Sequence, residues 1–484
     1  MKRVGFGVAA LMIAVFALCV ARALMLPAAV KEAPLPPIAV NGDEIARHVG
    51  EAIRFKTVSW EQGGTLDAQA FDDLIDWIAT TYPAANAAMT REIVNGHSLI
   101  YHWQGTDATQ KPIGFIGHLD VVPVEPGTED RWTHPPFSGD IAEGEVWGRG
   151  ALDNKGPFIT LLEAIERLAQ SGFRPSRDIY ILLGQDEELG GDNGAGKIAE
   201  ILKARSVHFS WMEDEGAGVV KDLIPGVDAP VALIDVAEKG SATLRLMATA
   251  PGGHSSAPGK DTAVSLVSRA VIAVTDHPYP LKFSGDIVAF LHAIAPETSF
   301  VERVALANLW LTGPLVKAKL AKDPAAAASM RTTTAATIIS GGTKSNVLPQ
   351  EAEAIVNYRI HPRDSVAGVE ARAERLINDK RVMVELLDGR EPTPPSPTEN
   401  EGYAALAAST RAIFGAVPVA PSLMIGGTDS RHYPEISDAN FRYLPFTFTP
   451  DMLELFHGTN ERVRIDTLAR ASAFYEDLIR RAAS

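Results

Sequence analysis

Four predicted strands of this chain end in acidic or histidine side chains, and this pattern restricts the fold more than any other feature. The endings are GHLD at 117–120, GALDNKG at 150–156, GQDEELGG at 184–191 and MEDEG at 212–216. Ligands of α/β sheets gather at the carboxyl ends of the strands, so we expect the four endings to meet at one edge of one sheet. So much buried negative charge requires a cation; the alternative is that these are solvated acids in scattered turns.

The spacing of apolar residues predicts an α/β catalytic domain with a mixed central sheet. Helices are expected over 43–55, 70–82, 156–172 and 194–205, and strands over 98–103, 112–120, 178–188 and 207–216. From residue 239 the strands alternate apolar and polar residues, which is typical of antiparallel sheets with one solvated face. They span 239–251, 334–342, 351–361 and 381–389, with helices at 262–274 and 366–377.

These patterns divide the chain into a catalytic domain and a smaller α+β domain inserted into it. The first part of the catalytic domain is expected over 43–237, the smaller lid or dimerisation domain over 238–388, and the second catalytic part over 389–484. Residues 283–333 are expected to be irregular and are interpreted as an insertion. Their apolar segments either shape a pocket for an acyl chain or an apolar side chain, or only extend the lid.

The N-terminus is interpreted as a targeting segment. Lys2 and Arg3 precede a run without charged residues over 4–21, long enough to span a bilayer with little tilt. We favour an uncleaved signal anchor over a cleaved signal peptide within residues 1–30, with the positive end inside. A proline-rich tether over 31–42 then leads to the folded part, so the protein is expected to be membrane-anchored or exported.

Composition excludes several other functions. The chain has 484 residues and a formal charge of −15, which argues against nucleic acid as a partner because phosphate binding needs a basic face. Its single cysteine, Cys19, lies in the N-terminal apolar run. The folded part therefore has neither disulfides nor a thiolate metal site, and a metal must be held by His, Asp or Glu.

Two imidazoles and three carboxylates are the candidate metal ligands. This donor set suits Zn²⁺, with Co²⁺ or Mn²⁺ as alternatives, and five ligands are too many for one tetrahedral zinc but suit two ions that share a carboxylate. Glu187 precedes a candidate ligand directly, so its side chain diverges and can act as the general base. The candidate ligands are His118, Asp153, Glu188, Asp214 and His457, the last expected at the start of the final helix.

Six motifs in order resemble the dizinc aminoacylase and carboxypeptidase family of metallopeptidases, peptidase family M20. They are GHLDVVP, GRGALDNKG, DEELGG, DEG, GGHSSAP and FHGTNE, and they cover nearly all of the chain from about residue 45. The sequence is most similar to the carboxypeptidase S branch and its N-acyl-amino-acid hydrolase relatives. Each motif alone is weak evidence, but the six together are highly specific.

The resemblance implies a role for each candidate ligand. His118 and Asp214 would bind one zinc ion, Glu188 and His457 the other, and Asp153 would bridge both. Relatives differ in whether Asp or Glu binds at the fourth motif, so Glu215 is the alternative to Asp214. The peptide bond after Asp153 would be cis.

Further roles come from the same resemblance. Glu187 would take a proton from a metal-bridged water, and Asp120 would orient His118, as is usual for metal-bound imidazoles. His254 would stabilise the oxyanion, often from a partner subunit, and thus through a homodimer of the smaller domain. The resemblance also gives Asn346 as a substrate contact. Apart from the resemblance, Arg431 is a candidate because a guanidinium matches a carboxylate, the alternative being a plain surface arginine, and Arg359 is a further candidate.

The predicted function is zinc-dependent hydrolysis of an amide bond next to a free carboxylate, as in carboxypeptidases and dipeptidases. An N-acyl-amino acid deacylase of the same family is the first alternative. A serine hydrolase is disfavoured because Ser255 and Ser256 lie in no G-x-S-x-G motif. An inactive binding module is disfavoured because Glu187 and all five candidate ligands are present.

Overall fold

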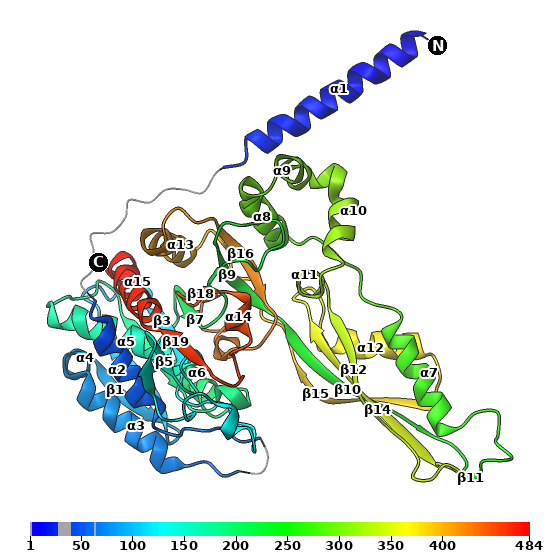
Figure 1. The fold of residues 1–484 in the computed structure, drawn as a ribbon, viewed down its shortest axis with the longest axis horizontal. Coiled ribbons are helices and arrows are strands. Elements are labelled where there is room, and N and C mark those ends of the chain that lie inside the picture. The colour runs from blue at the N-terminus through cyan, green and yellow to red at the C-terminus, as the bar shows by residue number, and fades with distance from the viewer. Residues whose placement is uncertain (1, 28–39, 62–63) are drawn as a thin grey trace.

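The structure is a computed structural model that describes residues 2–27, 40–61 and 64–484 (Figure 1). Most of the predicted tether, residues 31–39, lies outside the described residues. A large sheet with its helices forms one part of the molecule, and a smaller sheet extends away from it. This arrangement confirms the predicted α/β architecture with a mixed central sheet, while the domain boundaries at 237/238 and 388/389 stay predictions.

The large sheet has ten strands in the order β1-β2-β6-β3-β7-β17-β9-β8-β18, with β16 paired to β9. Its centre is parallel, because β3 pairs in parallel with both β6 and β7, whereas β1, β2 and β6 pair antiparallel. The strands are β1 (Thr90–Val94), β2 (Ser98–Trp103), β3 (Ile113–His118), β6 (Ile179–Gly184), β7 (Trp211–Asp214), β8 (Val219–Val220), β9 (Val231–Glu238), β16 (Val419–Met424), β17 (Asn440–Arg442) and β18 (Thr447–Phe448).

Helices cover both faces of this sheet, which explains its continuous apolar strands. Alternate residues of β6 pack into two different clusters: Ile181 faces α5, while Leu182 faces α6. The helices of the large part are α2 (Gly42–Ile53), α3 (Ala68–Thr81), α4 (Pro83–Ala88), α5 (Lys155–Gln170), α6 (Ala195–Ala204), α13 (Glu401–Phe414), α14 (Pro450–Leu453) and α15 (Ile465–Ala483), with short 3₁₀ turns η1 (Glu129–Arg131), η2 (Glu187–Leu189) and η4 (Asp429–His432).

The smaller sheet is antiparallel, in the order β12-β14-β10-β15. Every second residue of β10 is buried beneath two helices, as its alternating sequence predicts. The strands are β10 (Gly240–Thr249), β12 (Thr333–Ser340), β14 (Glu351–Ile360) and β15 (Val382–Arg390), and the helices are α7 (Ala263–Thr275) and α12 (Val366–Ile377). Two minor sheets complete the fold: β11 (Gly253–His254) with β13 (Val347–Leu348), and β4 (Asp140–Ala142) with β5 (Glu145–Trp147) and β19 (Arg462–Arg464).

The insertion is helical, not irregular as expected. Its helices are α8 (Gly285–Ile294), η3 (Ala295–Glu297), α9 (Phe300–Ala307), α10 (Leu309–Leu320) and α11 (Pro324–Ser329). Internal Gly and Pro residues, such as Pro314 inside α10, obscure the helical pattern in the sequence. On α8, Ile287, Leu291 and Ile294 join the core of the large sheet, so these apolar residues pack against β16.

The N-terminal run forms one long helix, α1 (Lys2–Leu24). Its segment Phe6–Leu24 is long and apolar enough to cross a membrane, and almost all of this segment is exposed in the structure. A signal sequence near the N-terminus has the same properties. Both predicted identities of residues 1–30 are therefore consistent with α1.

Candidate metal centre

The centre of the site is built where the parallel neighbours β3 and β6 end side by side. His118 is the last residue of β3 and is paired in register with Gly184, the last residue of β6. The turn that follows β6 carries Glu187 and Glu188 on η2. Two of the four acidic endings thus meet at one edge of the sheet, as expected. The expectation was wrong for GALDNKG, which follows β5 of the three-stranded sheet and no strand of the large one.

Asp120 connects these two endings. Its carboxylate accepts hydrogen bonds from the backbone N–H groups of Glu187 (3.1 Å) and Glu188 (3.2 Å) and from the Ser59 hydroxyl (2.6 Å). It also lies 3.3 Å from Nδ1 of His118. Both oxygens of the buried Asp120 carboxylate are engaged in these contacts, which argues against a role as a ligand. These contacts support its proposed role as the residue that orients His118, and they show that it also positions the paired glutamates.

Asp153 lies between the two histidines. Its Oδ1 is 2.9 Å from His118 Nε2, and its Oδ2 is 3.1 Å from His457 Nε2. Burial acts to raise the pKa of Asp153, but the hydrogen bonds from His118 and His457 outweigh it and hold the pKa below its usual range. The Asp153–Asn154 peptide bond is cis, as the resemblance implied. A carboxylate that presents one oxygen to each histidine has the geometry that a bridging ligand needs.

His457 reaches the site from the C-terminal part of the chain. It follows α14 in a turn and precedes the short strand β19, so it lies before the final helix α15 and not at its start. Its Nε2 is 3.5 Å from Glu188 Oε2, and its side chain is 54% exposed. His457 and Glu188 therefore face the same side of Asp153.

On the other side of Asp153, the structure places Glu215 and not Asp214 beside His118. Glu215 Oε1 is 3.5 Å from His118 Nε2, and Asn154 donates a 2.6 Å hydrogen bond to Glu215 Oε2. Asp214 is the last residue of β7, and its two oxygens accept hydrogen bonds from the backbone N–H groups of Glu215 and Ser430. Successive residues at the end of a strand point in opposite directions, so only one of the pair can face the centre. We propose Glu215 as the ligand.

The charges of the cluster fit divalent cations. Burial and the nearby Asp153 carboxylate raise the pKa of Glu188 to about 8 and that of Glu215 to about 7. Glu188 Oε1 is buried and has no hydrogen-bond partner among the described residues. Two groups of side chains could each hold an ion: His118 with Asp153 and Glu188, and His118 with Glu187 and Glu215. An ionised carboxylate that is buried without a hydrogen-bond partner is costly unless a cation compensates its charge.

Glu187, the proposed base, lies at the rim of this cluster. Burial raises the pKa of Glu187 well above its usual range, and Glu215 and Asp429 act in the same direction. The Arg431 guanidinium lies 3.4 Å from Glu187 Oε1. Arg431 is therefore next to the reactive part of the site, where a substrate carboxylate could reach it.

The remaining predicted residues lie elsewhere. His254 is exposed at the end of β11, and Asn346 is next to it, because the Asn346 carbonyl accepts a hydrogen bond from the Ser255 N–H. In Figure 1, β11 is at the end of the smaller sheet that is remote from the large sheet. Arg359 is exposed on β14, near Lys239; burial lowers the pKa of the Lys239 amine, and the Arg359 charge acts in the same direction. The structure thus separates these residues from the metal cluster within one chain.

Sequence reasoning missed a buried ion pair that supports the site. Glu461 accepts hydrogen bonds from the backbone N–H groups of Gly150, Leu152 and Asp153, and it pairs with Arg149 at 2.6 Å. Arg149 also donates to the carbonyl of His457 at 3.1 Å. This pair therefore fixes the backbone on both sides of the Asp153–His457 contact. Both residues belong to motifs that the sequence had already singled out, GRGALDNKG and FHGTNE.

Paired acids, two histidines and a shared aspartate at a sheet edge define a metallohydrolase site. A sequence profile described as "Peptidase family M20/M25/M40" matches residues 114–481. The chain belongs to this family of metal-dependent hydrolases and is an enzyme of the metallopeptidase and amidohydrolase type.

Curated relatives match most of the chain. It is 36% identical to the probable carboxypeptidase S-like 2 of Dictyostelium discoideum, over 90% of this chain and 85% of the relative. It is 36% identical to the mouse N-fatty-acyl-amino acid synthase/hydrolase PM20D1, over 89% of this chain and 86% of the relative. It is 30% identical to the yeast carboxypeptidase S, over 84% of this chain and 78% of the relative.

Solved structures share the fold. The M20 family metallo-carboxypeptidase Sso-CP2 from Sulfolobus solfataricus aligns with a TM-score of 0.63 at 18% identity, over 90% of this chain and 98% of that one. Human carnosine dipeptidase 1 aligns with a TM-score of 0.60 at 16% identity, over 91% of this chain and 96% of that one.

The choice between Glu215 and Asp214 can be tested by metal content. Glu215→Gln should lower the zinc bound from about two ions per chain to about one, because each ion needs three or four protein ligands. Asp214→Asn should retain both ions and lower the free energy of unfolding by about 1–3 kcal/mol, the cost of weakening its buried hydrogen bonds. Metal analysis by mass spectrometry and thermal unfolding give both values. The reverse pattern would assign the ligand to Asp214.

The supporting role of Glu461 predicts a loss of metal affinity without loss of a ligand. Glu461→Gln should weaken zinc binding by about 10–100-fold, the usual effect of disturbing groups that orient metal ligands. Competition with a chelator of known affinity measures this directly, and Glu145→Gln, which weakens an ion pair with Arg462 on a neighbouring strand, is the matched control. Equal affinities for the two variants would contradict the role.

Proposed function

We propose that this enzyme hydrolyses an amide bond next to a free carboxylate, with two zinc ions held by its own side chains. The observation that supports the proposal best is the position of Glu187 beside two half-sites that share Asp153. One half-site contains His118 and Glu215, and the other contains Glu188 and His457.

In the proposed reaction, Glu187 moves one proton from the attacking water to the leaving amine. Divalent cations bound here would polarise the substrate carbonyl and lower the pKa of a water molecule. Glu187 accepts a proton from the attacking water, whose oxygen forms a bond to the carbonyl carbon. Glu187 then donates this proton to the amide nitrogen as the C–N bond breaks, giving a carboxylic acid and an amine. Asp120 holds the backbone of Glu187 so that its carboxylate keeps its position.

Two arginines are proposed to recognise the free carboxylate of the substrate. Arg431 is within reach of the reacting bond because it lies beside Glu187. A planar guanidinium can donate two parallel hydrogen bonds to a carboxylate. Arg359 is the second candidate, and it would require the smaller sheet to approach the large one.

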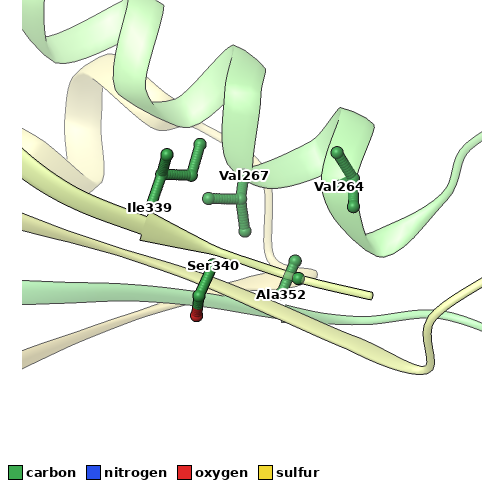
Figure 2. A pocket seen from close by; sticks show the side chains of 6 residues that line it. Val264, Val267, Ile339, Ser340 and Ala352 are labelled. Atoms are coloured by element: carbon green, nitrogen blue, oxygen red, sulfur yellow. The ribbon is translucent and has the colours of Figure 1, made fainter. Parts of the chain in front are cut away.

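We propose that His254, with Asn346 beside it, acts in the site of a second copy of the chain. Within one chain His254 Nδ1 is hydrogen-bonded to Ser256 Oγ (2.7 Å), and no described carboxylate contacts this pair, so it lacks the acid of a serine hydrolase triad. The smaller sheet offers a surface for dimerisation. Its edge strand β12 exposes Ile338 and Ile339, and an apolar hollow lies between β12 and α7 (Figure 2). Such an edge is a template for pairing with another chain.

A second candidate function is the hydrolysis of N-acyl amino acids with long acyl chains. It is favoured by relatives of about 35–36% identity from zebrafish, frog, mouse, cattle and human that are named N-fatty-acyl-amino acid synthase/hydrolase. The bond broken and the residues involved would be the same, since both substrates place an amide next to a free carboxylate.

A substrate panel tests the proposed reaction and separates the two candidates. The full chain with added zinc should hydrolyse either dipeptides or N-acyl amino acids, and their carboxyl-amidated analogues should react poorly. Glu187→Gln should lower kcat by about 10²–10⁴-fold, the usual contribution of a general base, while both zinc ions stay bound. Activity that survives chelation, or that survives in Glu187→Gln, would overturn the proposal.

The position of His254 predicts complementation between two inactive variants. His254→Ala and Glu187→Gln should each have low activity alone. Mixed under conditions that exchange subunits, they should form dimers in which one site has Glu187 from one chain and His254 from the other. Activity should then recover to a fraction of the wild-type value, measured against unmixed samples. No recovery would show that His254 does not act across a dimer.

A further inference from the structure

Two consecutive helices of the insertion, α9 and α10, present an exposed apolar surface. Five large apolar side chains on them are between 51% and 77% exposed. We call this surface the apolar platform; its members are Phe300, Val301, Trp310, Leu311 and Leu315.

The sequence of α10 explains why this surface is not buried within the chain. Its first eight residues, LWLTGPLV, carry apolar side chains on all sides of the helix and not on one stripe. Packing against the protein buries only Gly313 and Val316, so the other sides stay exposed. A helix that is apolar all round is stable either in a protein core or in contact with lipid.

The candidate membrane helix α1 is seated on the same two helices. Asn308, which joins α9 to α10, donates a 2.9 Å hydrogen bond to the Cys19 carbonyl, and Arg22 donates one of 3.3 Å to the Ala307 carbonyl. Cys19 and Ala23 are buried in this contact, whereas the rest of α1 points away from the molecule (Figure 1).

This contact sets the level of the platform relative to a bilayer. Asn308 meets α1 at Cys19, five residues before the end of the apolar segment at Leu24. At 1.5 Å per residue, the junction of α9 and α10 lies roughly 7 Å inside the end of that segment. Interfacial helices bury their apolar faces about 5–10 Å deep at the boundary between headgroups and acyl chains.

We propose that the apolar platform docks on the lipid bilayer beside α1 and holds the catalytic part against the membrane. The flanking residues suit this location. The indole of Trp310, a residue type enriched at membrane interfaces, donates a 3.3 Å hydrogen bond to Asn308. Lys317, Lys319 and Lys322 follow the apolar part of α10, where lysines favour anionic headgroups. In the structure Lys317 lies over the Phe283 ring and Lys319 is paired with Glu302.

The bilayer is favoured over a second copy of the chain as the occupant because the platform is continuous with α1. A dimer seated on these helices would have to leave space for the exposed helix that rises from them. The inference does not depend on the substrate, so its test needs no measurement of activity.

Site-specific fluorescence tests the docking in the full chain. In a Cys19→Ala background, Leu315→Cys carries an environment-sensitive label, and the protein is reconstituted into vesicles of phosphatidylcholine and phosphatidylglycerol. Val301→Cys is the second platform position. Ile93→Cys, on the exposed edge strand β1 and 51% exposed, is the matched control. Lipids that carry a quencher near the headgroup are then added.

The expected result is a blue-shifted emission from labels at positions 315 and 301, which the quencher-carrying lipids quench strongly. A label at position 93 should show neither effect. Quenching at 315 and 301 no greater than at 93 would overturn the proposal. Energy transfer between the platform labels of two copies, without quenching by the lipids, would show a dimer on this surface and would also overturn the proposal. Circular dichroism of each labelled chain verifies that it is folded.

Discussion

The structure of the site depends on one buried carboxylate that accepts hydrogen bonds from two strand ends. Asp120 follows β3, and its oxygens receive the N–H groups of Glu187 and Glu188, which follow β6. A charged acceptor makes such hydrogen bonds stronger than neutral ones and costly to break in the interior. The same carboxylate faces the imidazole of His118. The proposed ligands His118 and Glu188 and the proposed base Glu187 thus take their positions from one carboxylate.

The part of the site that follows from strand periodicity is the pair His118 and Glu188, because the parallel neighbours β3 and β6 end at one edge of the sheet. Asp153 and His457 reach this edge from turns outside the large sheet, and they were predicted from their motifs. The choice between Asp214 and Glu215 was beyond the sequence, since it depends on which way β7 turns as it ends. The sequence also did not indicate that Glu461 and Arg149 pair beneath the site, because the two residues are 312 positions apart in the chain. The fold class followed from composition and alternation, whereas the helices of 283–333 were hidden by glycine and proline.

The two sheets divide the work of the enzyme. The large sheet is buried on both faces and holds a charged cluster in a rigid frame, as precise metal geometry needs. The smaller sheet is covered on one face and carries His254 and Asn346 at its remote end. Residues proposed to contact the substrate can therefore vary in position through assembly or movement without disturbing the proposed metal ligands.

The location of His457 has a consequence for how the protein matures. Asp153 and His457 are 304 positions apart in the chain. During synthesis, Glu188 and His457 cannot meet until the segment that carries His457 has left the ribosome. His118 and Glu215 are both synthesised far earlier. The proposed half-site of Glu188 and His457 can therefore be completed only after all residues of the other one are present.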